Sequence, residues 1–192
     1  MTLHIEVLIL AAGAASRFGS AKQLISHHGK PLLQHCIDRA NALCPSRVSV
    51  VLGANHQQIE TQISGAKVIL NNHWQQGLGG SIAVGVEKID PQSDGLLILL
   101  ADQIALTTDD LNLLLAAFNG ENTVSAYYAG RRGVPALFPR SLYADLRLLS
   151  GDSGAKAVLE QGDIGLLEID LPQAAMDIDT PEDWARFLDS SN

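Results

Sequence analysis

The feature that most constrains this chain is an aliphatic run that ends abruptly in small residues, VLILAAGAASRFGSAK, at residues 7–22. The run VLIL has the length and composition of a buried parallel strand. The small residues that follow do not require burial, so we expect a ligand-binding loop there. Gly13 and Gly19 allow backbone N–H groups to approach a ligand, and Arg17 and Lys22 add positive charge. This combination predicts a polyphosphate-binding site.

Two common phosphate-binding motifs are absent from this stretch of sequence. A dinucleotide-binding turn requires G-x-G-x-x-G and a P-loop requires G-x-x-x-x-G-K-[ST], but five residues separate Gly13 from Gly19 and Ser20 follows. The stretch resembles instead the L-A-A-G-x-S-x-R-(M/F)-G-x-x-K signature of nucleotidyltransferases that activate phosphorylated metabolites. The matching residues are Leu10, Ala11, Ala12, Gly13, Ser16 (shifted by one residue), Arg17, Phe18, Gly19 and Lys22. The alternative is an ordinary glycine-rich turn with incidental basic residues, but every part occurs in the order of the signature.

Length and charge limit the function further. The 192 residues are 46% hydrophobic and 18% charged, which suits one folded domain, residues 1–192. The net charge of −8 argues against nucleic-acid or anionic-membrane binding, so a local basic cluster such as Arg17 and Lys22 must hold any anionic ligand. Cys36 and Cys44 have no metal-binding spacing and are expected to be core or semi-buried thiols in a reducing compartment. No stretch has membrane-spanning length, and His4 and Glu6 precede the apolar run instead of Lys or Arg, which predicts a cytoplasmic protein.

Strand and helix patterns alternate along the chain. The expected strands are residues 7–10, 47–52, 67–70, 96–100, 123–129, 134–138 and 165–171. The expected helices are residues 31–44, 54–63, 82–89, 109–118, 141–149, 155–161 and a last helix from Pro181. Such βαβαβ alternation is typical of a doubly wound parallel sheet, and a turn at residues 130–133 returns one strand antiparallel. The prediction is a single-domain α/β fold with a mostly parallel, Rossmann-like sheet of about seven strands.

A polar loop with three glycines, residues 71–81, precedes the helix at 82–89. Taken alone, it is typical of a flexible surface turn in which Ser81 caps the helix. Its order nevertheless resembles the N-x-x-W-x-x-G-x-x-x-S-x-x-x-G pattern of molybdenum cofactor cytidylyltransferases, matched by Asn71, Trp74, Gly77, Ser81 and Gly85. The resemblance implies that this loop lies beside the nucleobase.

Asp102 follows the unbroken aliphatic strand at residues 96–100. Ligands in open α/β sheets bind outside the carboxyl ends of strands, so we predict Asp102 as a metal ligand. The alternative is a helix-capping carboxylate, but Thr107 or Thr108 is available to cap the next helix. The family pattern is A-D-Q-P, whose Asp holds the catalytic magnesium. Ile104 stands here where that Pro is expected, which leaves the path of the following loop open.

The segment MDIDTPEDW, residues 176–184, resembles the D-I-D-T-P-E-D motif of the same family. Thr180 as cap and Pro181 in the first turn account for the start of a helix. Two carboxylates remain, Asp177 and Asp179, and a second carboxylate can complete a magnesium shell. We favour Asp177 over Asp179 as that ligand.

Two further segments resemble the acceptor side of the family. Gly133 and Pro135 match a G-x-P motif that often carries His or Asn in the middle, where this chain has Val134. Asp152 and Lys156 match G-D-x-G-A-R with Lys in place of Arg, an exchange that keeps the charge but loses the planar fork. The alternative for the second segment is a capped helix start. The resemblance implies that these segments bind the acceptor.

Five motifs in the correct order cover most of the chain and resemble the MobA/MocA-like nucleotidyltransferases, above all the molybdenum cofactor cytidylyltransferases. The resemblance implies a nucleotide-diphospho-sugar transferase-like fold. The implied reaction is Mg²⁺-dependent transfer of CMP from CTP to molybdopterin phosphate, which forms the cytosine dinucleotide cofactor and releases pyrophosphate. It also implies transient contact with a molybdoenzyme client. No nucleic-acid or membrane partner is expected.

The resemblance implies roles for individual residues. Arg17, Lys22 and Asp102 would be catalytic. The implied nucleotide-binding residues are Leu10, Ala11, Ala12, Gly13, Arg17, Lys22, Asn71, Gly77, Ser81 and Asp102. Two alternatives stay open because Ile104, Val134 and Lys156 depart from the family pattern. One is a nucleotidyltransferase with another phosphorylated acceptor or with GTP as donor, and the other is a non-catalytic molybdenum cofactor-binding chaperone.

Overall fold

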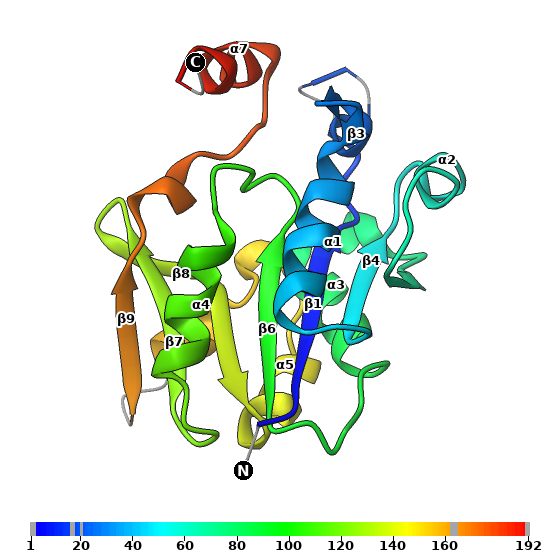
Figure 1. The fold of residues 1–192 in the computed structure, drawn as a ribbon. Coiled ribbons are helices and arrows are strands. Elements are labelled where there is room, and N and C mark those ends of the chain that lie inside the picture. Colours follow the sequence, from blue (N-terminus) through cyan, green and yellow to red (C-terminus); the bar gives the residue numbers. More distant parts are fainter. Residues whose placement is uncertain (1–2, 16–17, 20, 162–164, 191–192) are drawn as a thin grey trace.

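The computed structural model describes residues 3–15, 18–19, 21–161 and 165–190. Seven strands form one sheet in the order β5-β4-β1-β6-β8-β7-β9, with helices on both faces (Figure 1). These strands are β1 (Ile5–Ala11), β4 (Val48–Leu52), β5 (Lys67–Leu70), β6 (Gly95–Leu100), β7 (Thr123–Tyr128), β8 (Arg131–Pro139) and β9 (Leu166–Asp170). Only β8 runs antiparallel to its neighbours β6 and β7. The predicted mostly parallel sheet of about seven strands is confirmed.

The helices connect these strands close to their predicted positions. They are α1 (Leu32–Leu43), α2 (His56–Glu60), α3 (Leu78–Val86), α4 (Thr108–Ala117), α5 (Tyr143–Arg147), α6 (Lys156–Gln161) and α7 (Pro181–Ser190). Short 3₁₀ turns are η1 (Lys22–Leu24), η2 (Trp74–Gln76), η3 (Arg140–Leu142), η4 (Gly151–Ser153) and η5 (Pro172–Ala175). Thr107 caps α4 through a reciprocal capping box with Asp110, so Asp102 is not needed as that cap. None of the described helices is both long and apolar enough to cross a lipid bilayer.

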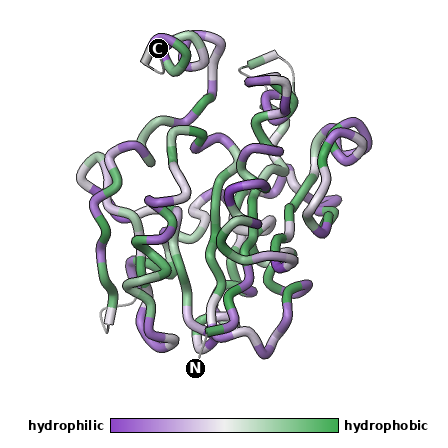
Figure 2. Tube along the Cα trace, in the orientation of Figure 1, coloured by the Kyte–Doolittle hydropathy of each residue, from purple (hydrophilic) through white to green (hydrophobic). Residues whose placement is uncertain are grey.

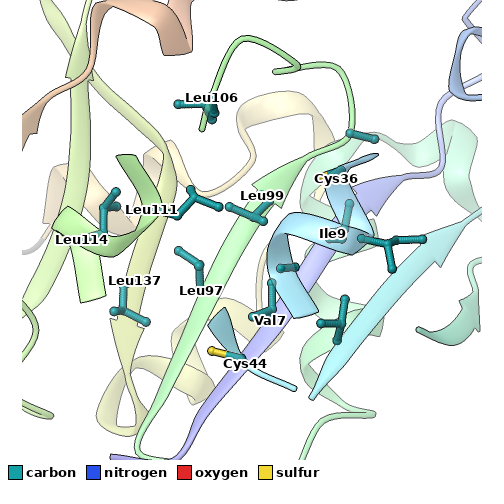
Figure 3. Packing of buried hydrophobic residues seen from close by; sticks show 14 of the residues in the cluster. Val7, Ile9, Cys36, Cys44, Leu97, Leu99, Leu106, Leu111, Leu114 and Leu137 are labelled. Carbon is teal, nitrogen blue, oxygen red and sulfur yellow. The ribbon is translucent and has the colours of Figure 1, made fainter. Parts of the chain in front are cut away.

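The centre of the sheet is buried on both faces because successive side chains of a strand point to opposite sides. In β1, Val7 and Ile9 pack with α1 and α4, whereas Leu8 and Leu10 pack with α3 and α5. Figure 3 shows the first of these layers, in which Cys36 of α1 lies close to Ile9. Figure 2 shows the same concentration of hydrophobic residues along the central strands. The unbroken run VLIL is therefore explained by burial on two faces.

Cys36 and Cys44 are both buried and unpaired. Burial raises the pKa of each thiol, so both are protonated at neutral pH. The expectation that they are core residues is confirmed.

A small antiparallel hairpin follows the loop after β1 and was not predicted. Its strands are β2 (Ser26–His27) and β3 (Lys30–Pro31). Strands of two residues carry no periodicity that a sequence pattern can reveal. The ring of His27 lies 5.4 Å from Trp184 and 5.5 Å from Phe187 of α7, measured between ring centroids. The hairpin thus provides the surface against which α7 packs.

Candidate nucleotide-binding site

A cavity of about 430 Å³ opens at the carboxyl ends of β1 and β6, where ligands collect in doubly wound sheets. Its walls come from the loops after these strands, the start of α3, the η4 turn and the segment before α7. The predicted nucleotide-binding residues that line it are Leu10, Ala11, Ala12, Gly13, Lys22, Gly77, Ser81 and Asp102. Arg17, together with Ser16, lies outside the described residues, so its role stays a prediction.

Lys22 joins two distant parts of the chain at this cavity. Its Nζ lies 2.8 Å from Asp102 Oδ2 and 2.7 Å from Asp179 Oδ1, and its side chain is 16% exposed. Burial by itself lowers the pKa of Lys22, but the two carboxylates outweigh burial and hold the pKa above its ordinary value. Lys22 is therefore charged at neutral pH and held between the loop after β1 and the segment before α7.

Asp177 adds a third carboxylate to this group. Burial, reinforced by the negative charges of Asp102 and Asp179, raises the pKa of Asp177 to about 6. The Oδ1 atoms of Asp102 and Asp177 are both buried and have no hydrogen-bond partner among the described residues. Carboxylate oxygens are the ligands that Mg²⁺ prefers. These two oxygens therefore fit a hard divalent cation.

The described part of the chain contains no set of three or more His, Cys, Asp or Glu side chains arranged to hold a metal ion. Mg²⁺ in nucleotide enzymes is commonly bound by one or two carboxylates, with substrate phosphates and water completing its shell. The arrangement is consistent with that mode. Asp102 and Asp179 both bind Lys22 and line the cavity, whereas Asp177 is absent from the cavity lining but has a buried Oδ1 without a described partner. The choice of Asp177 over Asp179 as the second ligand stays a prediction.

The raised pKa of Asp177 predicts that its ionised form destabilises the metal-free protein. A carboxyl whose pKa is higher in the folded than in the unfolded state makes the protein less stable as the pH rises between the two values. We expect Asp177→Asn to raise the melting temperature at pH 7.5 in EDTA, with a gain that shrinks as the pH falls from about 6 to about 4. Thermal unfolding across this range measures the effect.

Asp170→Asn, at an exposed position of β9, is the matched control and is expected to leave the melting temperature unchanged. An Asp177→Asn protein that is less stable than wild type at pH 7.5 in EDTA would contradict the prediction.

Gln23 shapes the loop after β1, although the sequence analysis did not single it out. Its side chain is 4% exposed, and its Nε2 donates to the backbone carbonyls of Ala11 at 3.1 Å and Gly13 at 3.0 Å. These bonds satisfy carbonyls at the end of the strand and hold the loop at the edge of the cavity. The available signal was a polar residue directly after Lys22, in front of the apolar pair LI.

Asn71 and Ser81 form a buried pair behind the cavity wall. Asn71 Nδ2 lies 3.0 Å from Ser81 Oγ, and Asn71 Oδ1 accepts a hydrogen bond from the backbone N–H of His73 at 2.9 Å. Ser81 lines the cavity, whereas Asn71 supports it from behind. Because α3 begins at Leu78, Ser81 lies inside the helix and does not cap it.

The loop before α3 packs backbone to backbone against the η4 turn. A Cβ atom on Gly77 would lie 2.4 Å from the carbonyl of Gly151, and one on Gly79 would lie 2.7 Å from the carbonyl oxygen of Ser150. Only glycine permits this approach. The two loops therefore form one wall, which explains why Asp152 lines the same cavity as Ser81.

The four residues predicted on the acceptor side do not lie together. Asp152 lines the nucleotide cavity. Gly133 and Pro135 belong to β8, which lies on the other side of β6 from β1. Lys156 is exposed at the start of α6, and its Nζ lies 3.4 Å from Glu160 Oε1. Sequence order alone did not reveal this separation.

Gln103 ties the acceptor side to the segment before α7. Its Nε2 donates to two backbone carbonyls, Val134 of β8 at 2.9 Å and Ala174 of η5 at 2.8 Å. The backbone N–H of Ile178 in turn donates to the carbonyl of Asp102 at 3.2 Å. These bonds fix the segment that carries the last two aspartates of the site against the loop after β6.

Comparison with known proteins agrees with this architecture. The family of MobA-like NTP transferase domains matches residues 7–165. The chain belongs to this family. The predicted enzyme class, a nucleotidyltransferase, is confirmed by that membership. In this MobA-like NTP transferase, β9, η5 and α7 lie beyond the matched residues, and so does the segment that supplies Asp177 and Asp179.

Relatives and solved structures resemble the chain over nearly its whole length. Nicotine blue oxidoreductase of Paenarthrobacter nicotinovorans is 28% identical over 194 residues, which cover 94% of this chain and 95% of the relative. Purine catabolism protein PucB of Bacillus subtilis (strain 168) is 30% identical over 192 residues and 92% of each chain.

The crystal structure of Rv0371c from Mycobacterium tuberculosis H37Rv has a TM-score of 0.86 at 24% identity, covering 98% of this chain and all of that one. A manganese complex of Rv0371c has a TM-score of 0.80 at 23% identity, covering 97% and 99% of the two chains. These likenesses confirm the fold.

Proposed function

We propose that this nucleotidyltransferase transfers CMP from CTP to molybdopterin phosphate in the cytoplasm, with Mg²⁺ as cofactor, and releases pyrophosphate. The observation that carries the proposal is the cluster of Lys22, Asp102 and Asp177 beside the cavity. A charged lysine and two carboxylate oxygens without protein partners are the groups that a triphosphate and its metal require. The manganese complex of the similarly folded Rv0371c supports a divalent cation in this fold.

The proposed reaction has one covalent step. An oxygen of the acceptor phosphate attacks the α-phosphorus of CTP, the bond to the β-phosphate oxygen breaks, and pyrophosphate leaves with that electron pair. The protein must align the substrates and neutralise charge, without forming a covalent intermediate. Lys22 and backbone N–H groups of residues 11–13 would bind the phosphates. Asp102 and Asp177 would hold Mg²⁺, which supplies further neutralisation of the phosphate oxygens when bound.

The choice of CTP rests on a tightly packed wall around Ala12. Its backbone carbonyl accepts a hydrogen bond from Ala54 N at 3.0 Å. A Cβ atom on Gly53 would lie 2.7 Å from the Ala12 carbonyl oxygen and 2.5 Å from Cβ of Trp74. The loop therefore has little room to shift away from a purine that pressed against the Ala12 methyl group, whereas a pyrimidine leaves more space.

We expect kcat/KM for CTP to exceed that for GTP by about tenfold or more, because one misplaced methyl group is worth roughly that discrimination. Competition between the two triphosphates for one acceptor measures the ratio. Ala12→Gly is expected to gain GTP use, and Ala14→Gly is the matched control because Ala14 lies outside this cavity. Comparable kcat/KM values for wild type would contradict the preference.

Two other functions are separated by the same assay. If pyrophosphate is released from CTP and Mg²⁺ with a different phosphorylated acceptor, that acceptor and not molybdopterin is the substrate. Binding of molybdopterin without pyrophosphate release from either CTP or GTP would favour a cofactor-binding chaperone. Because one relative is named an oxidoreductase, a direct transfer assay is more informative than the names of relatives.

A further inference from the structure

Two neighbouring arginines at the tip of the β7–β8 hairpin have different surroundings. Arg132 Nε lies 2.5 Å from Glu168 Oε1 of β9. Arg131 forms no ion pair within the described residues, and its guanidinium carbon lies 6.0 Å from the centre of the Tyr128 ring. Successive side chains of a strand point to opposite faces, which explains the difference. The unpaired guanidinium is therefore available to an anion.

Tyr128 provides a fixed support for this guanidinium. Its side chain is buried, and its hydroxyl donates a hydrogen bond to the carbonyl of Val134 at 3.1 Å. A Cβ atom on Gly133 would lie 2.4 Å from the same hydroxyl, so the absence of a side chain there admits the ring. A cation placed over a fixed aromatic ring loses less freedom when it binds a ligand.

The sheet order places this hairpin tip at the edge of the sheet where the cavity opens. The end of β7 and the start of β8 lie at the same edge as the carboxyl ends of β1 and β6, and β8 is on the opposite side of β6 from β1. Figure 1 shows the turn beside the segment that leads to α7, and Leu171 N donates to Tyr127 O at 3.0 Å across this contact.

The three carboxylates of the site would repel the phosphate of an acceptor, so a further cation at this edge would favour its binding. Lys22 binds Asp102 and Asp179, and Asp177 is a third carboxylate beside them. Lys156, the cation expected on the acceptor side from the sequence, is exposed and paired with Glu160.

We propose that Arg131 binds the phosphate group of the acceptor, with Tyr128 as its support. The ligand class is a phosphomonoester, because the planar guanidinium of arginine can donate two parallel hydrogen bonds to two oxygens of one phosphate group. The proposal rests on the proposed function for the identity of the reaction, but the binding of phosphate itself can be measured without turnover.

The test uses the full-length protein saturated with Mg²⁺ and the non-reactive cytidine 5′-(α,β-methylene)triphosphate, and titrates inorganic phosphate by calorimetry. We expect wild type and Arg132→Met to bind phosphate with equal affinity. Arg131→Met is expected to weaken binding by about tenfold or more, and Arg131→Lys by less, because the charge is kept and the fork is lost. Circular dichroism verifies that each variant is folded.

In the transfer assay, Arg131→Met is expected to raise KM for the phosphorylated acceptor about tenfold or more and to leave KM for CTP unchanged. Equal phosphate affinity of Arg131→Met and wild type would overturn the proposal, as would the absence of saturable phosphate binding to wild type. If wild type binds phosphate through Arg131 but releases no pyrophosphate with any acceptor, the proposed transfer reaction is wrong, whereas the assignment of Arg131 as a phosphate-binding residue is correct. If pyrophosphate is released but Arg131→Met behaves as wild type, only the assignment of Arg131 as the phosphate-binding residue is wrong.

Discussion

Replacing Lys22 by methionine is expected to reduce the rate of nucleotidyl transfer by about a hundredfold or more, because one preorganised charged donor contributes roughly 3 kcal/mol to a transition state. Its side chain is 16% exposed, and its ammonium group contacts carboxylates from two loops. The charge is therefore placed before substrate arrives, and no other described cation lines the cavity. Single-turnover measurement of pyrophosphate release, with CTP saturating, gives the change in the chemical step.

A second result separates catalysis from folding. Lys22→Met leaves the carboxylates of Asp102 and Asp179 without this cation, so we expect a lower melting temperature in EDTA that Mg²⁺ partly restores. Lys30→Met is the matched control: Lys30 Nζ lies 2.6 Å from Asp38 Oδ2 at the surface, and an exposed pair of this kind is worth little. A Lys22→Met protein with wild-type turnover would show that Lys22 does not take part in catalysis.

Asp102→Asn is expected to raise the Mg²⁺ concentration needed for half-maximal activity by about a hundredfold or more, since even the outer partner of a metal ligand is worth roughly 10–100-fold. The substitution keeps the shape of the side chain but removes the charge that a hard cation requires. Nucleotide affinity measured in EDTA is expected to change far less. Titration of Mg²⁺ against activity, together with calorimetry of CTP in EDTA, provides both numbers.

Asp109→Asn, in the first turn of α4 and outside the cavity, is the control for a general effect of lost negative charge. An unchanged Mg²⁺ requirement in Asp102→Asn would place the metal elsewhere. A loss of nucleotide affinity in EDTA as large as the loss of Mg²⁺ affinity would instead show that Asp102 acts mainly by positioning Lys22.

The sheet and the location of the cavity could be predicted because they depend on local patterns. Strands such as β1 and β6 are buried on both faces, so their sequences are nearly unbroken runs of aliphatic residues. Small and polar residues at their carboxyl ends, Gly13 and Asp102 among them, line the cavity at the edge where ligands of such sheets bind. The β2–β3 hairpin was missed because its two-residue strands have no period.

By itself, then, the sequence determined the succession of the main strands and helices along the chain, the edge of the sheet at which the cavity opens, and the chemical types of the groups there. Only the tertiary structure decided which of these groups meet. The pair of Lys22 and Asp179 joins residues 157 positions apart, and Asp177 acquires its raised pKa from burial beside other carboxylates. Asp152 and Lys156 are close in sequence, yet one lines the cavity and the other faces solvent. The physical reason is that periodicity records which face of an element is buried, whereas distances between side chains depend on how η5 and α7 pack against the sheet and the hairpin.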